Sequence, residues 1–262
     1  MLRGLYSSAA GMDVQQARVE KISNNLANAS TPGYKREEVF LKSFPEHLLI
    51  QQGGPKRTEG PPLNNPVTTI GPLGNGSLIA GTATDYGVGI LKETGNLTDI
   101  AIMGPGFFVV RIAGQEDPDQ VYYTRGGNFQ VDNEGYLMLN GKYHVLGEAG
   151  VIRVENDNFT VSADGSIDAG GTAVDRLRLV EFADRSDLTK EGEALFSAPP
   201  DSAGQAAGTT VVQGKLEMSN VNVIEEIAQS IAVMRAYEAN QRIIQNYDEI
   251  LNKAVNQVGS IR

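Results

Sequence analysis

Hydrophobic residues near the end of the chain, between positions 222 and 258, recur at alternating spacings of four and three. This heptad seam contains Val223, Ile227, Met234, Tyr237, Ile244, Leu251, Val255 and Val258, with Ser230, Gln241 and Asp248 as polar interruptions. The spacing predicts a long amphipathic helix. Asn222 can cap its first turn, and neither glycine nor proline follows before Gly259. Such a helix would be about 55 Å long, which is more than a domain of this size usually needs.

A second one-sided pattern lies at the other end of the chain. Leu5, Met12, Val19 and Leu26 recur every seven residues, with Ile22 and Ala29 in a second row. We therefore expect an amphipathic helix over about residues 3–28, which ends at Pro32-Gly33. The two helices could cover a core of the same molecule, or they could be surfaces for other chains. Their position at the chain ends favours docking, because unattached ends commonly fray.

The charges of the two ends favour their pairing. Residues 1–36 have five basic and two acidic side chains, whereas residues 216–262 have four basic and six acidic side chains. Exposed charges contribute little individually, so the hydrophobic seam must provide most of the attraction. We expect the two helices to pair as a layer that resembles a coiled coil.

The middle of the chain has the pattern of a β protein. Glycine, proline and asparagine concentrate between residues 51 and 84 without a regular period, which indicates a connector that is extended or irregular. Strands are expected at 107–112 and 121–124, and Asn140-Gly141 predicts a tight hairpin between 137–139 and 142–145. A further pattern, Phe-x-Val-x-x-acidic-Gly-x-aliphatic, begins at Phe129 and again at Phe159, and each copy predicts a strand that enters an acidic-Gly turn and a strand that leaves it.

These patterns predict an α+β fold with a central, mainly antiparallel β domain. The expected organisation is a discontinuous helical domain of residues 1–35 and 216–262, an extended connector of 36–87 and a β-rich domain of 88–215. Acidic residues outnumber basic ones by 32 to 22, giving a net charge of −10, which argues against nucleic acid or an anionic membrane as a partner.

Composition excludes several other classes. There is no cysteine for disulfides or thiolate metal sites. We find no run of about 18 apolar residues that could span a membrane. Polar residues interrupt the N-terminal apolar pattern, so no cleavable secretory signal is expected and export would need another route.

The sequence contains few signs of catalytic chemistry. The two histidines, His47 and His144, are far apart in the sequence and do not have the spacing of a zinc site. Gly104-Pro105-Gly106 precedes a strand rather than a helix, which is the wrong context for a phosphate loop. Asp132 and Asp164 lie in turn motifs without the full spacing of a calcium loop. We therefore expect no catalytic, cofactor-binding or metal-binding residues, and no cofactor.

Several separate motifs carry a resemblance to a known family. They are LYSSAAGM at 5–12, ISNNLAN at 22–28, TPGYK at 31–35, GNLTDIAI at 95–102, GPGFF at 104–108, YTRGG at 123–127, SNVNV at 219–223 and RAYEAN at 235–240. Together they resemble the bacterial flagellar rod and hook proteins over nearly the whole chain. The length and the RAYEAN run favour a distal rod type, and a proximal rod type is the close alternative.

The resemblance implies a structural subunit of the flagellar rod, which is not an enzyme. In that family the terminal helices of many copies pack as a tube around an export channel, and the β domain forms an outer layer. The implied partners are identical copies, other rod and hook proteins and the flagellar export apparatus. The implied location is the rod of the basal body, in the periplasmic or cell-envelope region, reached without a cleavable signal peptide.

The expected assembly interface follows from the apolar seams and the resemblance. It comprises Leu5, Met12, Val19, Asn24, Asn25, Leu26, Asn28, Ile227, Met234, Tyr237, Ile244 and Leu251. The three asparagines are expected to form hydrogen bonds across a packed interface, although exposed helix positions are the simpler interpretation. Other functions that we considered are a surface-exposed β-rich binding module or adhesin, and a carbohydrate-active enzyme with convergent carboxylates.

Overall fold

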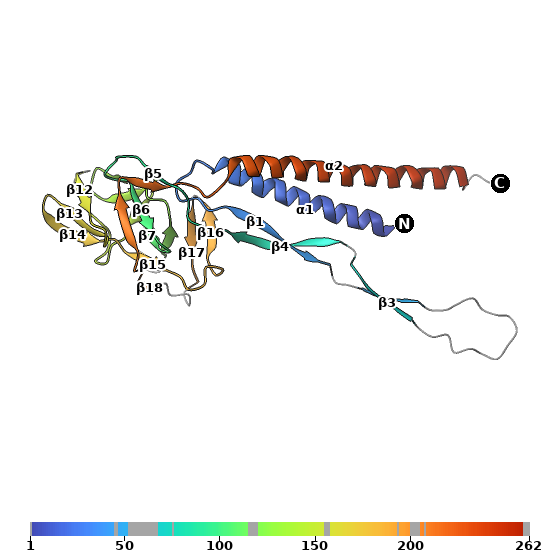
Figure 1. The fold of residues 1–262 in the computed structure, drawn as a ribbon, viewed down its shortest axis with the longest axis horizontal. Helices are drawn as coiled ribbons and strands as arrows, with labels where there is room; N and C mark the ends of the chain where they lie inside the picture. Colours follow the sequence, from blue (N-terminus) through green and yellow to red (C-terminus); the bar gives the residue numbers. More distant parts are fainter. Residues whose placement is uncertain are drawn as a thin grey trace. The chain divides into compact units, whose positions relative to one another are not determined.

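The computed structural model confirms the α+β fold (Figure 1). One helix lies at each end of the sequence, and the sequence between the two helices forms mainly antiparallel strands. The structure describes residues 2–44, 47–51, 68–74, 76–114, 120–154, 158–192, 194–199, 205–206 and 208–258. Residues 52–67, the centre of the predicted connector, lie outside this description. The chain forms two compact units. The helical unit contains Met1–Ser23, Glu38–Ala83 and Ile227–Arg262, and the β unit contains Asn24–Glu37 and Thr84–Glu226.

The two helices agree closely with the bounds expected from the sequence. Helix α1 comprises Leu2–Ala27, and α2 comprises Val223–Lys253 followed by the π-helical turn Ala254–Val258. Asn222 caps α2, because its Oδ1 accepts a hydrogen bond from the backbone N–H of Ile224 at 3.2 Å. This cap satisfies an N–H group that has no partner within the helix.

The helical unit also contains strands from the predicted connector. Its strands are β1 (Glu37–Ser43), β2 (His47–Gln51), β3 (Thr68–Leu73) and β4 (Ser77–Thr84). β1 pairs with β4, and β2 pairs antiparallel with β3. Within this unit α1 and α2 run antiparallel, with the two chain termini at the same end (Figure 1).

The β unit is built on a nine-stranded sheet in the order β16-β17-β8-β7-β11-β10-β9, with β15 pairing with β7 and β18 pairing with β15. The strands are β7 (Phe107–Ile112), β8 (Tyr122–Thr124), β9 (Phe129–Val131), β10 (Leu137–Leu139), β11 (Tyr143–Val145), β15 (Leu179–Glu181), β16 (Thr189–Gly192), β17 (Leu195–Ser197) and β18 (Gln205–Ala206). Neighbouring strands in this sheet are antiparallel.

Smaller strand groups complete the β unit. β12 (Phe159–Val161), β13 (Ser166–Ala169) and β14 (Thr172–Arg176) form a three-stranded sheet. β19 (Thr210–Gln213) pairs with β6 (Ile100–Met103), and β20 (Lys215–Glu217) pairs with β5 (Leu91–Glu93). The segment that leads into α2 is therefore bound into the β unit by backbone hydrogen bonds.

The central strand β7 contributes to two hydrophobic cores. Phe108 and Val110 belong to a large core that also contains Phe129 and Leu137. Phe107 and Val109 belong to a second core with residues such as Leu146, Val180, Phe182 and Phe196. Because successive side chains of a strand point to opposite faces, a strand with both faces covered has a continuous apolar run. This arrangement explains the uninterrupted apolar residues 107–110.

The predicted hairpins are confirmed. Met138 pairs with His144 across β10 and β11, while Asn140 and Gly141 have φ values of 52° and 64°. Positive φ at both central positions is the geometry that an Asn-Gly turn favours. The repeated pattern forms two similar hairpins, in which Val131 pairs with Leu137 and Val161 pairs with Ile167.

Candidate functional site

A buried group of charged side chains lies inside the β unit. We call Lys35, Arg36, Arg125, Glu217 and Glu226 the buried charge cluster. The Glu217 side chain is fully buried and accepts hydrogen bonds from Lys35 Nζ at 2.7 Å and from Arg125 Nη1 at 3.2 Å. Because each cation has an oxygen of its own on the same carboxylate, Glu217 provides the opposite charge for both.

The two cations at Glu217 also have neutral partners. Lys35 Nζ donates to the carbonyl of Gly87 at 2.7 Å, and Arg125 Nη2 donates to the carbonyl of Gly104 at 2.6 Å. Burial lowers the pKa values of Lys35 and Arg125, and the negative charge of Glu217 opposes that shift. Removal of the Glu217 carboxylate would therefore leave two buried cations without their negative partner.

A second ion pair connects the segment before β1 with the start of α2. Arg36 Nε lies 2.5 Å from Glu226 Oε1, and Glu226 is buried. The backbone N–H of Arg36 donates to Asn220 Oδ1 at 2.8 Å, and Asn220 Nδ2 donates to the carbonyl of Asp85 at 2.9 Å. Residues from three distant parts of the sequence therefore share one hydrogen-bond network.

The predicted asparagine cluster is part of the same region. Asn25 is 1% exposed, and its side chain binds the backbone of Glu37 twice. Asn25 Nδ2 donates to the Glu37 carbonyl at 2.9 Å, and the Glu37 backbone N–H donates to Asn25 Oδ1 at 3.0 Å. The hydroxyl of Tyr34 lies 2.8 Å from Asn24 Oδ1 and 3.1 Å from Asn25 Oδ1, within donating distance of both. Burial, with Glu37 and Glu226, raises the pKa of Tyr34.

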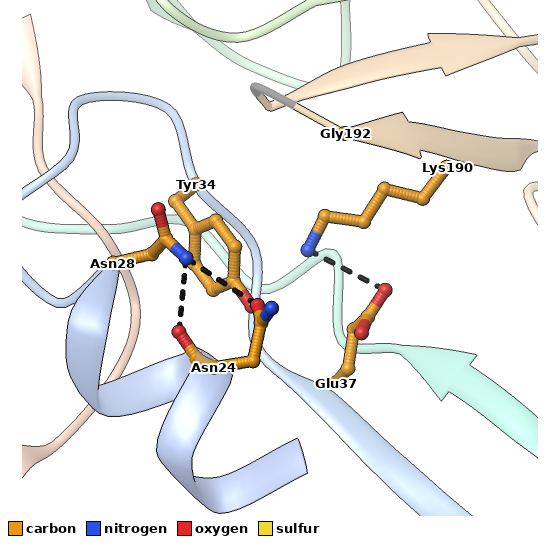
Figure 2. Close-up of a pocket in the computed structure, with 6 residues that line it drawn as sticks. All are labelled: Asn24, Asn28, Tyr34, Glu37, Lys190 and Gly192. Atoms are coloured by element: carbon orange, nitrogen blue, oxygen red, sulfur yellow. Dashed lines mark hydrogen bonds and ion pairs between the residues drawn. The ribbon is translucent and has the colours of Figure 1, made fainter. Parts of the chain in front are cut away.

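A polar pocket of about 160 Å³ lies beside these asparagines, lined by Asn24, Asn28, Tyr34, Glu37, Lys190 and Gly192 (Figure 2). Lys190 Nζ lies 3.6 Å from the centre of the Tyr34 ring and 3.5 Å from Glu37 Oε1. Asn28 Nδ2 donates to the carbonyl of Asn24 at 2.9 Å. The charged groups of this pocket therefore neutralise each other, and the asparagines have partners within the chain.

On α1, the predicted interface residues lie beside the most buried row. Leu5, Met12 and Val19 are half-buried and Leu26 is exposed, whereas Ser8, Val14, Ile22 and Asn25 are buried. Small residues face α2 in the helical unit. A Cβ atom on Gly4 would lie 2.2 Å from Tyr247 Oη, and one on Gly11 would lie 2.8 Å from Asn240 Nδ2. The two helices therefore come close together at Gly4 and Gly11, where there is no Cβ atom to keep them apart.

On α2, the residues of the predicted seam differ in exposure. Tyr237 and Ile244 are half-buried, on the side of the helix where Val233 is buried. Ile227, Met234 and Leu251 are exposed by 45%, 51% and 39%. The seam predicted from the sequence does not include Ile224 and Ile231, which are exposed by 80% and 51% and are seven residues apart, like Ile227 and Met234. We call Ile224, Ile227, Ile231 and Met234 the α2 stripe, because their spacing places them along one side of the helix.

Comparison with known sequences gives matches over three segments of the chain. Residues 5–35 match the family described as flagella basal body rod protein, residues 101–169 match the flagellar hook protein FlgE/F/G D1 domain, and residues 212–257 match the flagellar basal body rod FlgEFG protein C-terminal family. The flagellar basal-body rod protein FlgG of Bacillus subtilis is 34% identical, covering 98% of this chain and 99% of that protein. The chain belongs to the flagellar basal-body rod protein family.

Other similar proteins have the same full-length coverage. FlgG of Buchnera aphidicola subsp. Schizaphis graminum is 34% identical over 97% of this chain and 98% of its own length. The flagellar hook-basal body complex protein FlhO of Bacillus subtilis is 32% identical over 100% of both chains. These relatives confirm a structural protein of the bacterial flagellar rod, located in the basal body and involved in motility, rather than an enzyme.

The buried charge cluster is the place where the three matched segments of this rod-family protein meet. Lys35 belongs to the first, Arg125 to the second and Glu217 to the third, and Glu217 binds both cations. Within the described part of the chain, no cluster of metal-ligand side chains is present and neither helix is long and apolar enough to cross a membrane.

Proposed function

We propose that this rod subunit polymerises through its terminal helices into a hollow helical shaft that transmits torque from the motor to the hook. The main support is the α2 stripe, since four large apolar side chains on one side of a helix lie 45–80% exposed. Monomeric proteins rarely leave a contiguous apolar surface of this kind without a binding role. Identical subunits that make head-to-tail contacts which do not close form helical filaments.

The proposal includes partners and location. Identical copies would contact the α2 stripe, and other rod and hook proteins would join at the two ends of the shaft. The proposed assembly interface also includes Leu5, Met12, Val19, Asn24, Asn25, Leu26, Asn28, Tyr237, Ile244 and Leu251. The subunit would pass through the flagellar export apparatus, without a cleavable signal peptide, to the periplasmic part of the rod. The RAYEAN run at 235–240 supports a distal rod type, with the proximal type as the alternative.

Substitution of Met234 tests this proposal. Met234→Asp places a charge on the α2 stripe, and burial of an unpaired charge costs several kcal/mol. Ala232→Asp is the matched control, because it adds the same charge at an exposed position about 160° around the helix. We expect Met234→Asp to raise the critical concentration for polymerisation at least about tenfold, equivalent to about 1.4 kcal/mol.

Both variants should retain the thermal unfolding of the β unit, because neither position belongs to it. Sedimentation of polymer against subunit concentration gives the critical concentration. Polymerisation of Met234→Asp at the wild-type concentration, with Ala232→Asp also unchanged, would contradict the role of this surface.

A further inference from the structure

A second pocket in the β unit contains two arginines that have no ionic partner among the residues that the structure describes. The pocket has a volume of about 200 Å³, and the residues that line it include Arg111, Val121, Leu146, Glu148, Val151 and Arg178. Arg111 lies near the end of β7, and Arg178 directly precedes β15. This size suits one amino-acid side chain rather than a larger small-molecule ligand.

The Arg111 side chain is the unusual feature of the pocket. Its Nε atom is buried and has no hydrogen-bond partner within the described part of the chain. Buried polar groups are nearly always hydrogen-bonded, so an unsatisfied one requires an explanation such as a missing partner. Neither Arg111 nor Arg178 forms an ion pair with a described residue. Arg125 Nε likewise has no hydrogen-bond partner among the described residues, but the Arg125 guanidinium forms an ion pair with Glu217, which Arg111 lacks.

The other groups in the pocket do not neutralise these two charges. Among the described lining residues, Glu148 supplies the one carboxylate, and its Oε1 lies 3.5 Å from Nη1 of Arg176, which does not line the pocket. The backbone N–H of Glu148 donates to the carbonyl of Arg176, and that of Ala149 donates to Asp175. The turn is thus held by residues outside the pocket, and the two guanidiniums remain available to an anion.

The pocket also has an apolar wall. Leu146 is a member of the second hydrophobic core, and Val121 and Val151 pack against that core. Two guanidiniums beside a small aliphatic surface suit a carboxylate on a short hydrocarbon stem. Arginine presents a planar fork of donors that matches a carboxylate with two parallel hydrogen bonds.

We propose that the Arg111–Arg178 pocket binds a carboxylate side chain from a neighbouring copy of this chain. The inference rests on the proposed polymerisation, which brings copies into contact. Charge complementarity supports a second copy as the source, because 32 acidic residues against 22 basic ones make carboxylates the commonest charged groups on the chain. The contact would join β units, and it is distinct from the apolar α2 stripe.

The first test uses the full-length monomer and glutarate, a dicarboxylate with a short hydrocarbon stem. We expect glutarate to shift the side-chain Nε–Hε NMR signals of Arg111 and Arg178 in a saturable way, whereas chloride at equal ionic strength does not. Signals that respond equally to the two anions would overturn the assignment of a carboxylate site. This result does not depend on polymerisation, so it remains informative if the rod proposal fails.

The second test measures polymerisation of Arg111→Gln/Arg178→Gln against the control Arg153→Gln/Lys92→Gln, which removes the same charge from exposed positions of the β unit. We expect the pocket variant to raise the critical concentration about tenfold more than the control does. Equal critical concentrations for the pocket variant and the control would overturn the neighbouring copy as the source of the carboxylate. If glutarate nevertheless binds, the pocket would instead be a site for free carboxylates. Failure of the wild type to polymerise would instead contradict the proposed function.

Discussion

The β unit and the helical unit differ in which side chains they bury. In the β unit even charged groups are buried, with Lys35 and Glu217 at 1% exposure and large apolar residues such as Phe108 at 0%. In the helical unit, Ile231, Met234 and Ile250 on α2 remain exposed by more than half. A buried charge is stable only where its partners are in place. An exposed apolar side chain does not prevent folding, and its later burial against a partner is favourable. The β unit therefore has its charged groups paired within one chain, whereas in the proposed assembly other copies would cover the exposed apolar residues of the helical unit.

Truncation should give the largest contrast between the two units. A fragment of residues 24–226 contains the whole buried charge cluster, so we expect it to unfold cooperatively. A fragment of residues 36–215 contains Arg125 but lacks Lys35 and Glu217, and we expect it not to fold. Far-ultraviolet circular dichroism during urea titration distinguishes them. If the shorter fragment has the same cooperative transition, the cluster does not hold the β unit together.

The next largest effect should come from Glu217→Gln. It leaves Lys35 and Arg125 buried without their negative partner, and loss of one member of a buried ion pair typically costs about 3–5 kcal/mol. Glu93→Gln is the matched control, since Glu93 is exposed on β5, the strand that pairs with β20. Urea unfolding of the full-length monomer measures both changes. A loss below about 1 kcal/mol for Glu217→Gln would show that the charges are compensated by other groups.

A smaller, pH-dependent effect is expected for Tyr34→Phe. Loss of the hydroxyl removes its contacts with Asn24 and Asn25, and one hydrogen bond contributes about 1 kcal/mol. Burial raises the pKa of Tyr34 above 10.0, so the folded state holds the proton more tightly than the unfolded state. The contribution is fully present below pH 10.0 and is lost as the pH rises above it.

The difference in unfolding free energy between wild type and Tyr34→Phe should therefore shrink above pH 10.0. Tyr86 and Tyr123, whose pKa values burial also raises, are present in both proteins and cancel in the comparison. A difference that stays constant as the solution becomes more alkaline would count against the buried hydroxyl.

The smallest effect concerns the contact between α1 and α2. Alanine in place of an exposed helical glycine favours the helix by about 1 kcal/mol. At Gly4 the added methyl group would meet the Tyr247 ring, at 2.2 Å from Oη and 2.7 Å from Cζ, so we expect this gain to be lost. Ser7→Ala, at an exposed position of α1, is the control. Circular dichroism at 222 nm should show less helix in Gly4→Ala than in Ser7→Ala, and the reverse order would argue against this pairing.

Local features of the fold were predictable because short segments determine them. The Asn222 cap, the Asn140-Gly141 turn and the repeated acidic-Gly hairpins depend on residues that are close in sequence, and the structure confirms each of them. The continuous apolar run at 107–110 likewise identified a strand that is covered on both faces.

The charge cluster and the second pocket were not predictable from the sequence. Lys35 and Glu217 are 182 positions apart, and no local pattern distinguishes a buried charged residue from an exposed one. The heptad pattern on α2 selected Ile227 and Met234 but missed Ile224 and Ile231, because a single seam was assumed where apolar residues occupy more than one face. Gly4 and Gly11 were missed for a related reason, since hydrophobic periodicity does not detect contacts made through small residues.

The central claim is that the helical unit is a surface for neighbouring copies, whereas the β unit is stable in each subunit alone. Amide hydrogen exchange on monomer and polymer tests this claim directly, because protection reports local stability. We expect residues 2–23 and 227–258 to exchange much faster than β7 in the monomer and to become protected in the polymer. Equal protection of these helices and β7 in the monomer, with no change on polymerisation, would contradict the account.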